Sequence, residues 1–545
     1  MRSTSPDVLV VGAGPVGLTA TADLLRHGVS CRLIDVAPAA TDKSKALVLW
    51  SRSLELLDDM GIVAPFLAAG QPAHGISMYA DAEPLLHMPL TIDSAYGYAL
   101  MIPQCDTERL LTEHLTEIGT SIERGTALVS FTPDDTGVTA KLRHPDGTTE
   151  TVRTAWLVGC DGAHSTVRHG LGLDFTGAAE TNDWMLADVH LAGPIKQDEV
   201  SIFFHSDGVL VIFPIHGDRY RVIADLGPAA PTERAADPSL GDVQRMVDRR
   251  APIGLTVRDP VWLAGFRINE RKVARYRHGR VLLAGDAAHI HSPAGGQGMN
   301  TGMQDAYNLG WKLALVQQGH AQDVLLDTYS DERSAVGEMV LRQAALLTRA
   351  ATMRNPIAQR LRNHLYSLLG SIELVRHKIG ETMAELSVNY RQSALSAESR
   401  GLSAAAWLLG GGVAPGDRMP DAPLTDARSG ASTSLYDVMR GTRHVLLLLA
   451  EKHDPASLAP LAEAVDSELV TSHVIIAGDA LPPWNGPVWR DREGALHKTL
   501  GAHGPTAYLI RPDNYVGWRS QPADAAALAV HLAGYLKSGT SQRSR

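Results

Sequence analysis

The sequence predicts an α/β fold in which an antiparallel sheet is inserted between the strands of a parallel sheet, followed by a helical segment and a second α/β unit. Apolar strands that run into glycine-containing turns recur at residues 7–17, 156–162 and 281–298. Between the last two, apolar runs alternate with Gly, Asp and Pro turns, which is typical of an antiparallel meander. At 545 residues the chain is too long for one hydrophobic core.

The first glycine-rich turn has the pattern of a dinucleotide fingerprint. Asp7 to Val11 predicts a short strand that runs into the glycine-rich turn, and a helix follows as far as His27. The next strand ends at Asp35, eighteen residues after Gly17, where a carboxylate can accept hydrogen bonds from a ribose diol. This order predicts a Rossmann-like domain whose dinucleotide-binding residues are Gly12, Gly14, Pro15, Val16, Gly17 and Asp35.

The turn after the strand Val281 to Ala284 is the most informative segment. Asp286 follows the end of that strand, where open α/β sheets bind ligands. The glycines Gly295, Gly296 and Gly298 let backbone N–H groups approach an anionic or carbonyl-rich ring. A helix that begins near Met299 directs its positive end to the same place. The segment predicts a cofactor loop, and a simple tight connection is the alternative.

A third strand, Trp156 to Cys160, ends in Asp161-Gly162-Ala163-His164-Ser165-Thr166-Val167-Arg168. The three motifs, in this order, closely resemble those of the single-component FAD-dependent aromatic hydroxylases, the group typified by para-hydroxybenzoate hydroxylase. The resemblance covers residues 5–400. It implies non-covalent FAD, NAD(P)H as a transient co-substrate, and hydroxylation of a phenolic or fused-ring polyketide aromatic by O₂ through a C4a-hydroperoxyflavin.

The resemblance also assigns roles to residues. It implies that Gln104 contacts the ribityl side of the flavin, that Arg109 lies near the phosphates, and that Pro293 borders the isoalloxazine ring where the substrate stacks. Backbone N–H groups from Gly298 to Asn300 would stabilise negative charge at the flavin N1/O2 edge. The expected catalytic residues are Pro293, Gly298, Met299 and Asn300. The cofactor-binding set adds Asp161, Gly162, Gly285, Asp286 and Gly296.

Lys45 and Arg52 complete the cofactor set, and each needs a qualification: Lys45 departs from the family pattern, and Arg52 has a second interpretation. Lys45 stands where relatives often carry arginine, so a bidentate phosphate clamp becomes a point charge. Arg52 matches an arginine of the polyketide-tailoring and phenol-hydroxylase branches, and the alternative is a helix-surface pair with Glu55 at i,i+3. Asp35 replaces the more usual glutamate, which shortens its reach by one methylene.

The substrate half is expected from the runs 185–191, 199–205, 209–215 and 220–226, which predict antiparallel strands above the flavin. Four apolar residues of these strands are candidates for a substrate pocket, and core packing is an equally good interpretation. They are Phe203, Phe213, Ile215 and Val222. No side chain in this region identifies itself as a catalytic base.

The expected domain division follows from these segments. The FAD-binding domain comprises residues 1–180 and 265–350, and the substrate domain comprises 75–105 and 181–264. A helical scaffold occupies 351–410. Residues 411–537 resemble the thioredoxin-like appendage of phenol-hydroxylase-type relatives, but they contain no cysteine, which excludes thiol redox chemistry. Residues 538–545 are expected to be disordered.

Composition narrows the class further. A net charge of -10 without basic runs argues against nucleic-acid or anionic-membrane partners. The longest apolar run, Val445 to Ala450, is far shorter than the roughly 20 residues that span a bilayer. The polar start of the chain predicts no signal peptide, and three scattered cysteines favour the reducing cytoplasm. No metal site is expected, because the flavin motif accounts for His289 and His291. Monomer and homodimer both remain open.

Two other functions remain as alternatives. A Baeyer–Villiger or epoxidising flavin monooxygenase would carry the same cofactor motifs. A flavin-fold protein that carries a ligand without turnover belongs to another class, and the intact Gly298 to Asn300 region, which a carrier does not need, argues against it.

Overall fold

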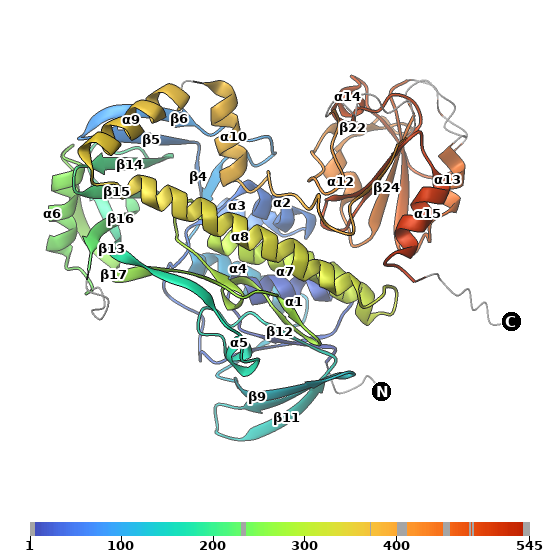
Figure 1. Cartoon of the computed structure of the whole chain (residues 1–545), viewed down its shortest axis with the longest axis horizontal. Coiled ribbons are helices and arrows are strands. Elements are labelled where there is room, and N and C mark those ends of the chain that lie inside the picture. The colour runs from blue at the N-terminus through green and yellow to red at the C-terminus, as the bar shows by residue number, and fades with distance from the viewer. Residues whose placement is uncertain are drawn as a thin grey trace.

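The computed structural model describes residues 6–229, 236–370, 372–400, 411–450, 458–478, 481 and 484–537. The expected tail at 538–545 and the last part of the expected helical scaffold, 401–410, lie outside these residues. Figure 1 shows the long helix α8 (Leu325–Ala351) crossing the middle of the molecule, with the C-terminal unit at one end and a second large sheet at the other. None of the described helices is long and apolar enough to cross a membrane.

The N-terminal sheet is parallel, apart from one edge strand, and it confirms the predicted α/β fold. Its order is β18-β19-β12-β1-β2-β8, and only β18 runs antiparallel to its neighbour. The three motif strands β1, β12 and β19 are therefore adjacent. The strands span Arg277–His278 (β18), Val281–Leu283 (β19), Trp156–Gly159 (β12), Val8–Val11 (β1), Cys31–Asp35 (β2) and Ile122–Arg124 (β8).

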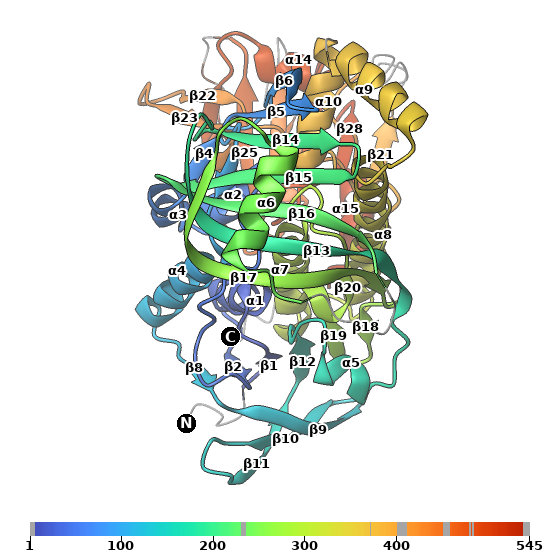
Figure 2. The same ribbon diagram turned by 90° about the vertical axis from the view of Figure 1, so that its left-hand side faces the viewer.

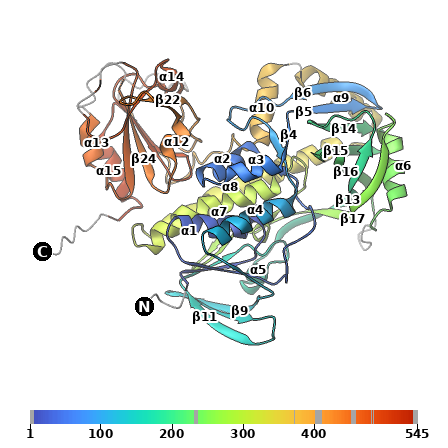
Figure 3. The same ribbon diagram turned by 180° about the vertical axis from the view of Figure 1, so that it is seen from behind.

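Helices α1 (Pro15–Arg26) and α7 (Gly298–Gln317) pack against each other beside this sheet, and α4 (Gln104–Glu117) lies next to α1 (Figure 3). Gly17 lets the first turn of α1 pack against the fingerprint turn, because a Cβ there would lie 1.9 Å from the carbonyl oxygen of Gly12. Gly12 itself has a φ of +101°, and a Cβ would lie 2.4 Å from the Cys160 carbonyl oxygen. Gly12 and Gly17 are thus required by backbone packing. A separate hairpin sheet, β9 (Ala127–Asp134), β10 (Gly137–Arg143) and β11 (Thr149–Thr154), extends from the far side.

The second sheet has eight strands in the order β20-β17-β13-β16-β15-β14-β5-β6. Helix α6 (Leu240–Arg250) crosses one face of it (Figure 2). The four predicted strands are present, and three of them are longer than predicted. Strand β17 continues to Lys272, past the expected domain boundary at 264, because it stays paired with β13. The bounds are His289–Ile290 (β20), Thr256–Lys272 (β17), Thr176–Ala192 (β13), Arg219–Pro228 (β16), Gly208–His216 (β15), Glu199–His205 (β14), Gly75–Ala80 (β5) and Glu83–Pro89 (β6).

The remaining helices include two short ones near the N-terminus and two that follow α8. The sequence predicts a helical scaffold at 351–410, but the described part of this segment has two helices, α9 (Pro356–Gly370) and α10 (Glu373–Met383), and residues 397–400 form a strand, β21. That strand pairs with the C-terminal sheet. The other short elements are α2 (Ser51–Asp59), α3 (Val63–Ala69), α5 (Thr166–Gly170), β3 (Val48–Leu49), β4 (Gln71–Ala73) and β7 (Ala99–Met101).

The C-terminal unit is a mixed sheet flanked by helices, as predicted. Its order is β21-β28-β27-β24-β25-β26-β22-β23, with a fully buried β24 at its centre. The elements are Ala397–Arg400 (β21), Pro423–Asp426 (β22), Ser432–Ser434 (β23), Leu435–Met439 (α12), His444–Ala450 (β24), Ala459–Glu463 (α13), Val470–Ile476 (β25), Val488–Arg490 (β26), Ala495–Leu500 (α14), Thr506–Ile510 (β27), Val516–Gln521 (β28) and Ala525–Ala533 (α15).

The β27–β28 hairpin joins this unit to the rest of the molecule through buried charges. Arg511 donates two hydrogen bonds to Glu332 of α8, at 2.8 and 2.9 Å, and Lys312 of α7 lies 2.7 Å from the same carboxylate. Burial alone would raise the pKa of Glu332, but these two cations hold it well below its ordinary value. The carboxylate therefore stays charged in the interior, where each partner is needed.

We expect Arg511→Ala to lower the free energy of unfolding by about 3 to 5 kcal/mol, because it leaves a buried carboxylate undercompensated. Chemical denaturation followed by tryptophan fluorescence measures this. Arg342→Ala is the control, because Arg342 pairs with Glu338 on the exposed surface, where a pair contributes about 1 kcal/mol or less. Equal effects of the two substitutions would contradict the assignment.

Candidate active site

The carboxyl ends of β1, β12 and β19 bring the three sequence motifs together. The Cys160 N–H donates to the Val11 carbonyl at 2.8 Å, and the Ala284 N–H donates to the Gly159 carbonyl at 3.0 Å. The turns that follow these strands therefore form one continuous edge. This is the edge at which open parallel sheets bind their ligands.

In the fingerprint turn, Asp35 is already used by the protein backbone. Its carboxylate accepts hydrogen bonds from the N–H groups of Ala13, at 2.6 Å, and Ala37, at 2.7 Å, and Arg124 lies 3.4 Å away. Gly14 differs from the other fingerprint glycines, because no atom lies within 4 Å of the position that its Cβ would take. The open side of the turn is thus at Gly14, next to the N-terminus of α1, as a bound pyrophosphate requires.

The Asp161 motif supports the neighbouring turn. Asp161 accepts hydrogen bonds from the Ser165 hydroxyl, at 2.5 Å, and from the Val167 N–H, at 3.1 Å, so it shapes the start of α5. Burial raises its pKa. Arg168, which the sequence analysis quoted without a role, donates to the Ala287 carbonyl at 3.2 Å. The motif therefore supports the segment after β19, residues 285–300, which is named the cofactor turn. The contact of Asp161 and Gly162 with FAD or NAD(P)H stays a prediction.

Asp286 lies in a 3₁₀ turn, Gly285–Ala287, directly after β19. Its side chain is exposed and has no hydrogen-bond partner among the described residues. Although the side chain reaches solvent, the protein atoms around it still desolvate the carboxylate and raise its pKa, while the charges of His289 and Lys45 act in the opposite direction. Gly285, with a φ of +60°, lets the turn pack against Val16, which lies 2.7 Å from a Cβ built there. The fingerprint and the Asp286 turn are thus in direct contact.

The glycine-dense turn before α7 is held by side chains, and this leaves its backbone available. The Asn300 amide accepts from the Trp50 N–H at 2.9 Å and donates to the carbonyls of Val48 and Gly296, both at 2.9 Å. Pro293 is exposed, and its carbonyl accepts from the Gly296 N–H at 2.9 Å. The side chain of Asn300 therefore fixes the turn, and the predicted cofactor contacts of residues 298–300 would come from the backbone.

Gln104 is hydrogen-bonded to the segment that contains Lys45. Gln104 accepts from the Ala46 N–H at 3.0 Å, and its own N–H donates to the Ala46 carbonyl at 2.9 Å. Lys45 is exposed. Arg221 of β16, which the sequence analysis missed, is buried and donates to the Lys45 carbonyl at 2.7 Å while it pairs with Asp188. This hydrogen bond could not be predicted from the sequence, because Arg221 is 176 residues away from Lys45.

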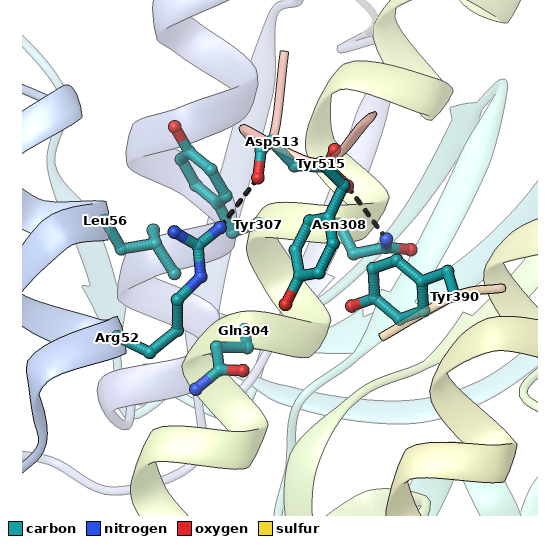
Figure 4. Close-up of a pocket in the computed structure, with 8 residues that line it drawn as sticks. All are labelled: Arg52, Leu56, Gln304, Tyr307, Asn308, Tyr390, Asp513 and Tyr515. Atoms are coloured by element: carbon teal, nitrogen blue, oxygen red, sulfur yellow. Dashed lines mark hydrogen bonds between the residues drawn. The ribbon is translucent and has the colours of Figure 1, made fainter. Parts of the chain in front are cut away.

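Arg52 and Arg109, which the family resemblance assigns to the cofactor set, both interact with protein groups in this structure. Arg52 pairs with Glu55 at 3.1 Å, as the alternative interpretation proposed, but the pair is buried, and Arg52 also donates to the Asp513 carbonyl at 2.6 Å. Figure 4 shows this contact in a small cavity between the N-terminal helices and the C-terminal hairpin. Arg109 is half exposed and pairs with Glu113 at 2.9 Å and Asp106 at 3.3 Å. In this structure, both arginines bind protein carboxylates or carbonyls.

The four candidate substrate residues lie on two different faces of the second sheet, which runs from β20 to β6. Phe203 and Val222 are fully buried in the cluster beneath α6, so they are core residues. Phe213 and Ile215 lie on the opposite face, in a cluster with Val48 and Trp50 beside the glycine-dense turn. The sequence shows that alternate residues of a strand point to opposite faces of the sheet, but it does not show which face α6 covers. It therefore could not tell the core residues from those on the other face.

No group of three or more His, Cys, Asp or Glu residues in the described part of the chain could hold a metal ion. His289 is buried and its Nε2 lies 2.7 Å from Asp305, which also accepts from Arg333 at 2.6 Å. His291 stacks beside His289, and burial lowers its pKa to about 4.

Comparison with known proteins agrees with this geometry. The family described as FAD binding domain matches residues 5–344, and the one described as aromatic-ring hydroxylase, C-terminal, matches residues 413–537. The chain is 36% identical to 6-methylpretetramide 4-monooxygenase of Streptomyces rimosus, covering 97% of this chain and 94% of that protein. It is 33% identical to pentachlorophenol 4-monooxygenase of Sphingobium chlorophenolicum, covering 95% and 94%.

Solved structures give the same result. An aromatic hydroxylase from angucycline biosynthesis superposes with a TM-score of 0.77 at 29% identity, covering 97% of this chain and 98% of that one. Aklavinone-11 hydroxylase in complex with FAD and aklavinone gives 0.77 at 27% identity, covering 98% and 99%. The chain therefore belongs to the FAD-dependent aromatic-ring hydroxylases, which are monooxygenases. The open side of the turn at Gly14 and the unpaired Asp286 carboxylate fit FAD as its cofactor.

We expect Asp286→Ala to weaken FAD binding by roughly 10- to 100-fold, because a hydrogen bond to a charged group contributes about 1.5 to 3 kcal/mol. Titration of the apoprotein with FAD, followed by flavin fluorescence, measures the dissociation constant. Asp331→Ala on the exposed side of α8 removes the same charge and serves as the control. Wild-type affinity in the Asp286 variant would exclude this role.

Proposed function

We propose that this monooxygenase hydroxylates a phenolic, fused-ring aromatic with NAD(P)H and O₂. The observation that carries the proposal is the convergence of three motif turns beside an apolar cluster of the second sheet, which contains Phe213 and Ile215. A planar apolar substrate stacks in such a place, between a flavin and an apolar sheet face. Baeyer–Villiger oxidation and epoxidation remain alternatives, since they need the same cofactor residues.

The fused-ring substrate class is supported by the relatives. The first two named above are called after 6-methylpretetramide and pentachlorophenol, and one solved relative binds aklavinone. These names cover both large polyketide-type substrates and a single ring. We favour the fused-ring class because the relative at 36% identity is named after 6-methylpretetramide, and the two solved relatives named above are hydroxylases of angucycline biosynthesis and of aklavinone.

In the proposed site, the chain binds and orients the cofactor. Gly14 and the N-terminus of α1 would receive the pyrophosphate, and Asp286 would accept a hydrogen bond from the cofactor. The first turn of α7 would stabilise charge at the flavin N1/O2 edge, and Pro293 would border the ring. FAD, when bound, supplies the redox chemistry that activates oxygen. The protein excludes water and positions the ring carbon.

NAD(P)H would bind transiently near the surface. The sequence has one GxGxxG fingerprint, so no second Rossmann domain is available for the reductant. The exposed Lys45, beside the proposed cofactor site, supplies a cation suited to a phosphate. We also propose the reducing cytoplasm as the compartment, from the three unpaired cysteines. Monomer and homodimer are both consistent with this proposal.

We expect NAD(P)H oxidation to be slow without an aromatic and to rise by orders of magnitude with the true substrate, because substrate binding gates reduction when no fixed nicotinamide domain exists. The rate of NAD(P)H oxidation is measured with a panel of fused-ring and single-ring phenols. The products are then analysed by mass detection after reaction with ¹⁸O₂. One labelled oxygen atom should enter the product. A protein that binds a phenol tightly but never oxidises NAD(P)H would be a carrier.

We expect Pro293→Gly to loosen the wall beside the flavin ring, so that more hydrogen peroxide forms per NAD(P)H while FAD stays bound. Peroxide and product are quantified together with NAD(P)H consumption. Pro133→Gly is a matched control, since Pro133 is exposed on β9, in the separate hairpin sheet. Unchanged coupling in the Pro293 variant would show that this residue does not border the reacting face.

A further inference from the structure

Helix α10 ends in an unusual way. Its last turn is closed by hydrogen bonds from the Leu386 N–H to the Glu381 carbonyl, at 3.0 Å, and from the Glu385 N–H to the Thr382 carbonyl, at 3.3 Å. Such an ending places one residue in the left-handed region, and that residue is usually glycine. Here it is Glu385, with a φ of +60°. A side chain at this position is conformationally unfavourable, so its contacts must compensate.

Those contacts are made with the start of α7. The Glu385 carboxylate is buried and accepts from the Thr301 hydroxyl at 2.7 Å and from the Gln304 amide. Burial raises its pKa to about 7, opposed by the charge of Arg333 and reinforced by that of Asp305. Gln304 lies beside Arg52 in the cavity between the domains (Figure 4). Both carboxylate oxygens are thus used by the first two turns of α7.

Neighbouring contacts hold the same junction. The Gln297 amide donates to the Thr382 carbonyl at 3.1 Å, and the Arg52 N–H donates to the Ala384 carbonyl at 3.3 Å. On its other side, the end of α10 belongs to the apolar cluster that contains Phe213 and Ile215, through Met383, Ala384 and Leu386. The end of α10 therefore contacts both the proposed substrate face and the turn that is proposed to hold the flavin ring.

We propose that Glu385 is a positioning residue that fixes the first turns of α7 against α10 and thereby sets the orientation of the backbone N–H groups that hold the flavin ring. This rests on the proposed placement of the ring beside residues 298–300. Thr301 and Gln304 each donate to one of its carboxylate oxygens, so we assign Glu385 a positioning role and no direct contact with flavin or substrate. Its effect on the cofactor passes through the position of α7.

The test compares three substitutions at Glu385 with a matched control. Glu385→Gly and Glu385→Ala remove both hydrogen bonds, and the glycine variant also relieves the left-handed backbone. We expect both to raise the FAD dissociation constant about tenfold or more, and to change the visible absorption band and the reduction potential of the bound flavin. Glu385→Gln keeps an acceptor for Thr301, so it should restore near wild-type values.

Ala82→Gly is the control, since Ala82 has a φ of +70° in the turn between β5 and β6 and lies outside the α10–α7 junction. It should leave the FAD constant, spectrum and potential unchanged. If the glycine and alanine variants do not fold, Thr301→Val removes the same interaction from the α7 side and should move the potential in the same direction.

Wild-type FAD affinity, spectrum and potential in the folded Glu385 variants, or in Thr301→Val, would overturn the proposal, even if their melting temperatures fell. A Gln variant as impaired as the alanine variant would also overturn it, because no acceptor-dependent rescue would remain. Failure of the wild-type protein itself to bind FAD would overturn the proposed function together with this inference. The two failures are therefore distinguishable.

Discussion

Helix α7 is buried from Met299 to Leu315, yet its middle carries Asp305, Asn308 and Lys312. Buried charges and amides are costly unless each is paired, and this constraint organises the molecule. Asp305 is paired by Arg333 of α8 and by His289 of the cofactor turn. Lys312 and Asn308 are paired by Glu332 of α8. Burial lowers the pKa of Lys312 to about 8, although the Glu332 charge acts against this. One helix therefore connects the cofactor turn with the rest of the structure.

The same constraint explains the C-terminal unit. The tip of its β27–β28 hairpin supplies Arg511 to Glu332 and Asp513 to Asn308, at 3.0 Å. Arg511 also lies over the rings of Tyr390 and Tyr515, at 5.0 and 5.8 Å from their centroids. The unit contains no cysteine and so cannot exchange disulfides. Its hairpin completes this buried network. The network is a structural reason for the chain to extend beyond the flavin fold.

Local patterns predicted much of this architecture, and contacts distant in sequence account for what they missed. The strands, the glycine turns and the cysteine-free C-terminal unit follow from periodicity and turn residues. Arg52 could not be placed, since a pair at i,i+3 has the same pattern whether it is exposed or covered by a hairpin more than 450 residues away. Phe203 and Phe213 share a residue type but not a face. Glu385 was missed because the end of α10 lacks the glycine that normally marks such an ending.

The aspartates near the strand ends differ in whether their carboxylate oxygens already accept hydrogen bonds from the protein. This difference distinguishes aspartates that support the fold from one that can bind a ligand. Asp35 and Asp161 both lie at strand ends, but two backbone N–H groups donate to Asp35, and one hydroxyl and one backbone N–H donate to Asp161. Asp305 lies nineteen residues after Asp286 and is fully buried. Burial alone would raise its pKa, but Arg333 and His289 hold it low. Asp286 has a raised pKa and no hydrogen-bond partner among the described residues, so its acceptor capacity is unused. Asp305 thus holds the fold, because the protein supplies its carboxylate with donors, whereas the carboxylate of Asp286 stays available to a ligand.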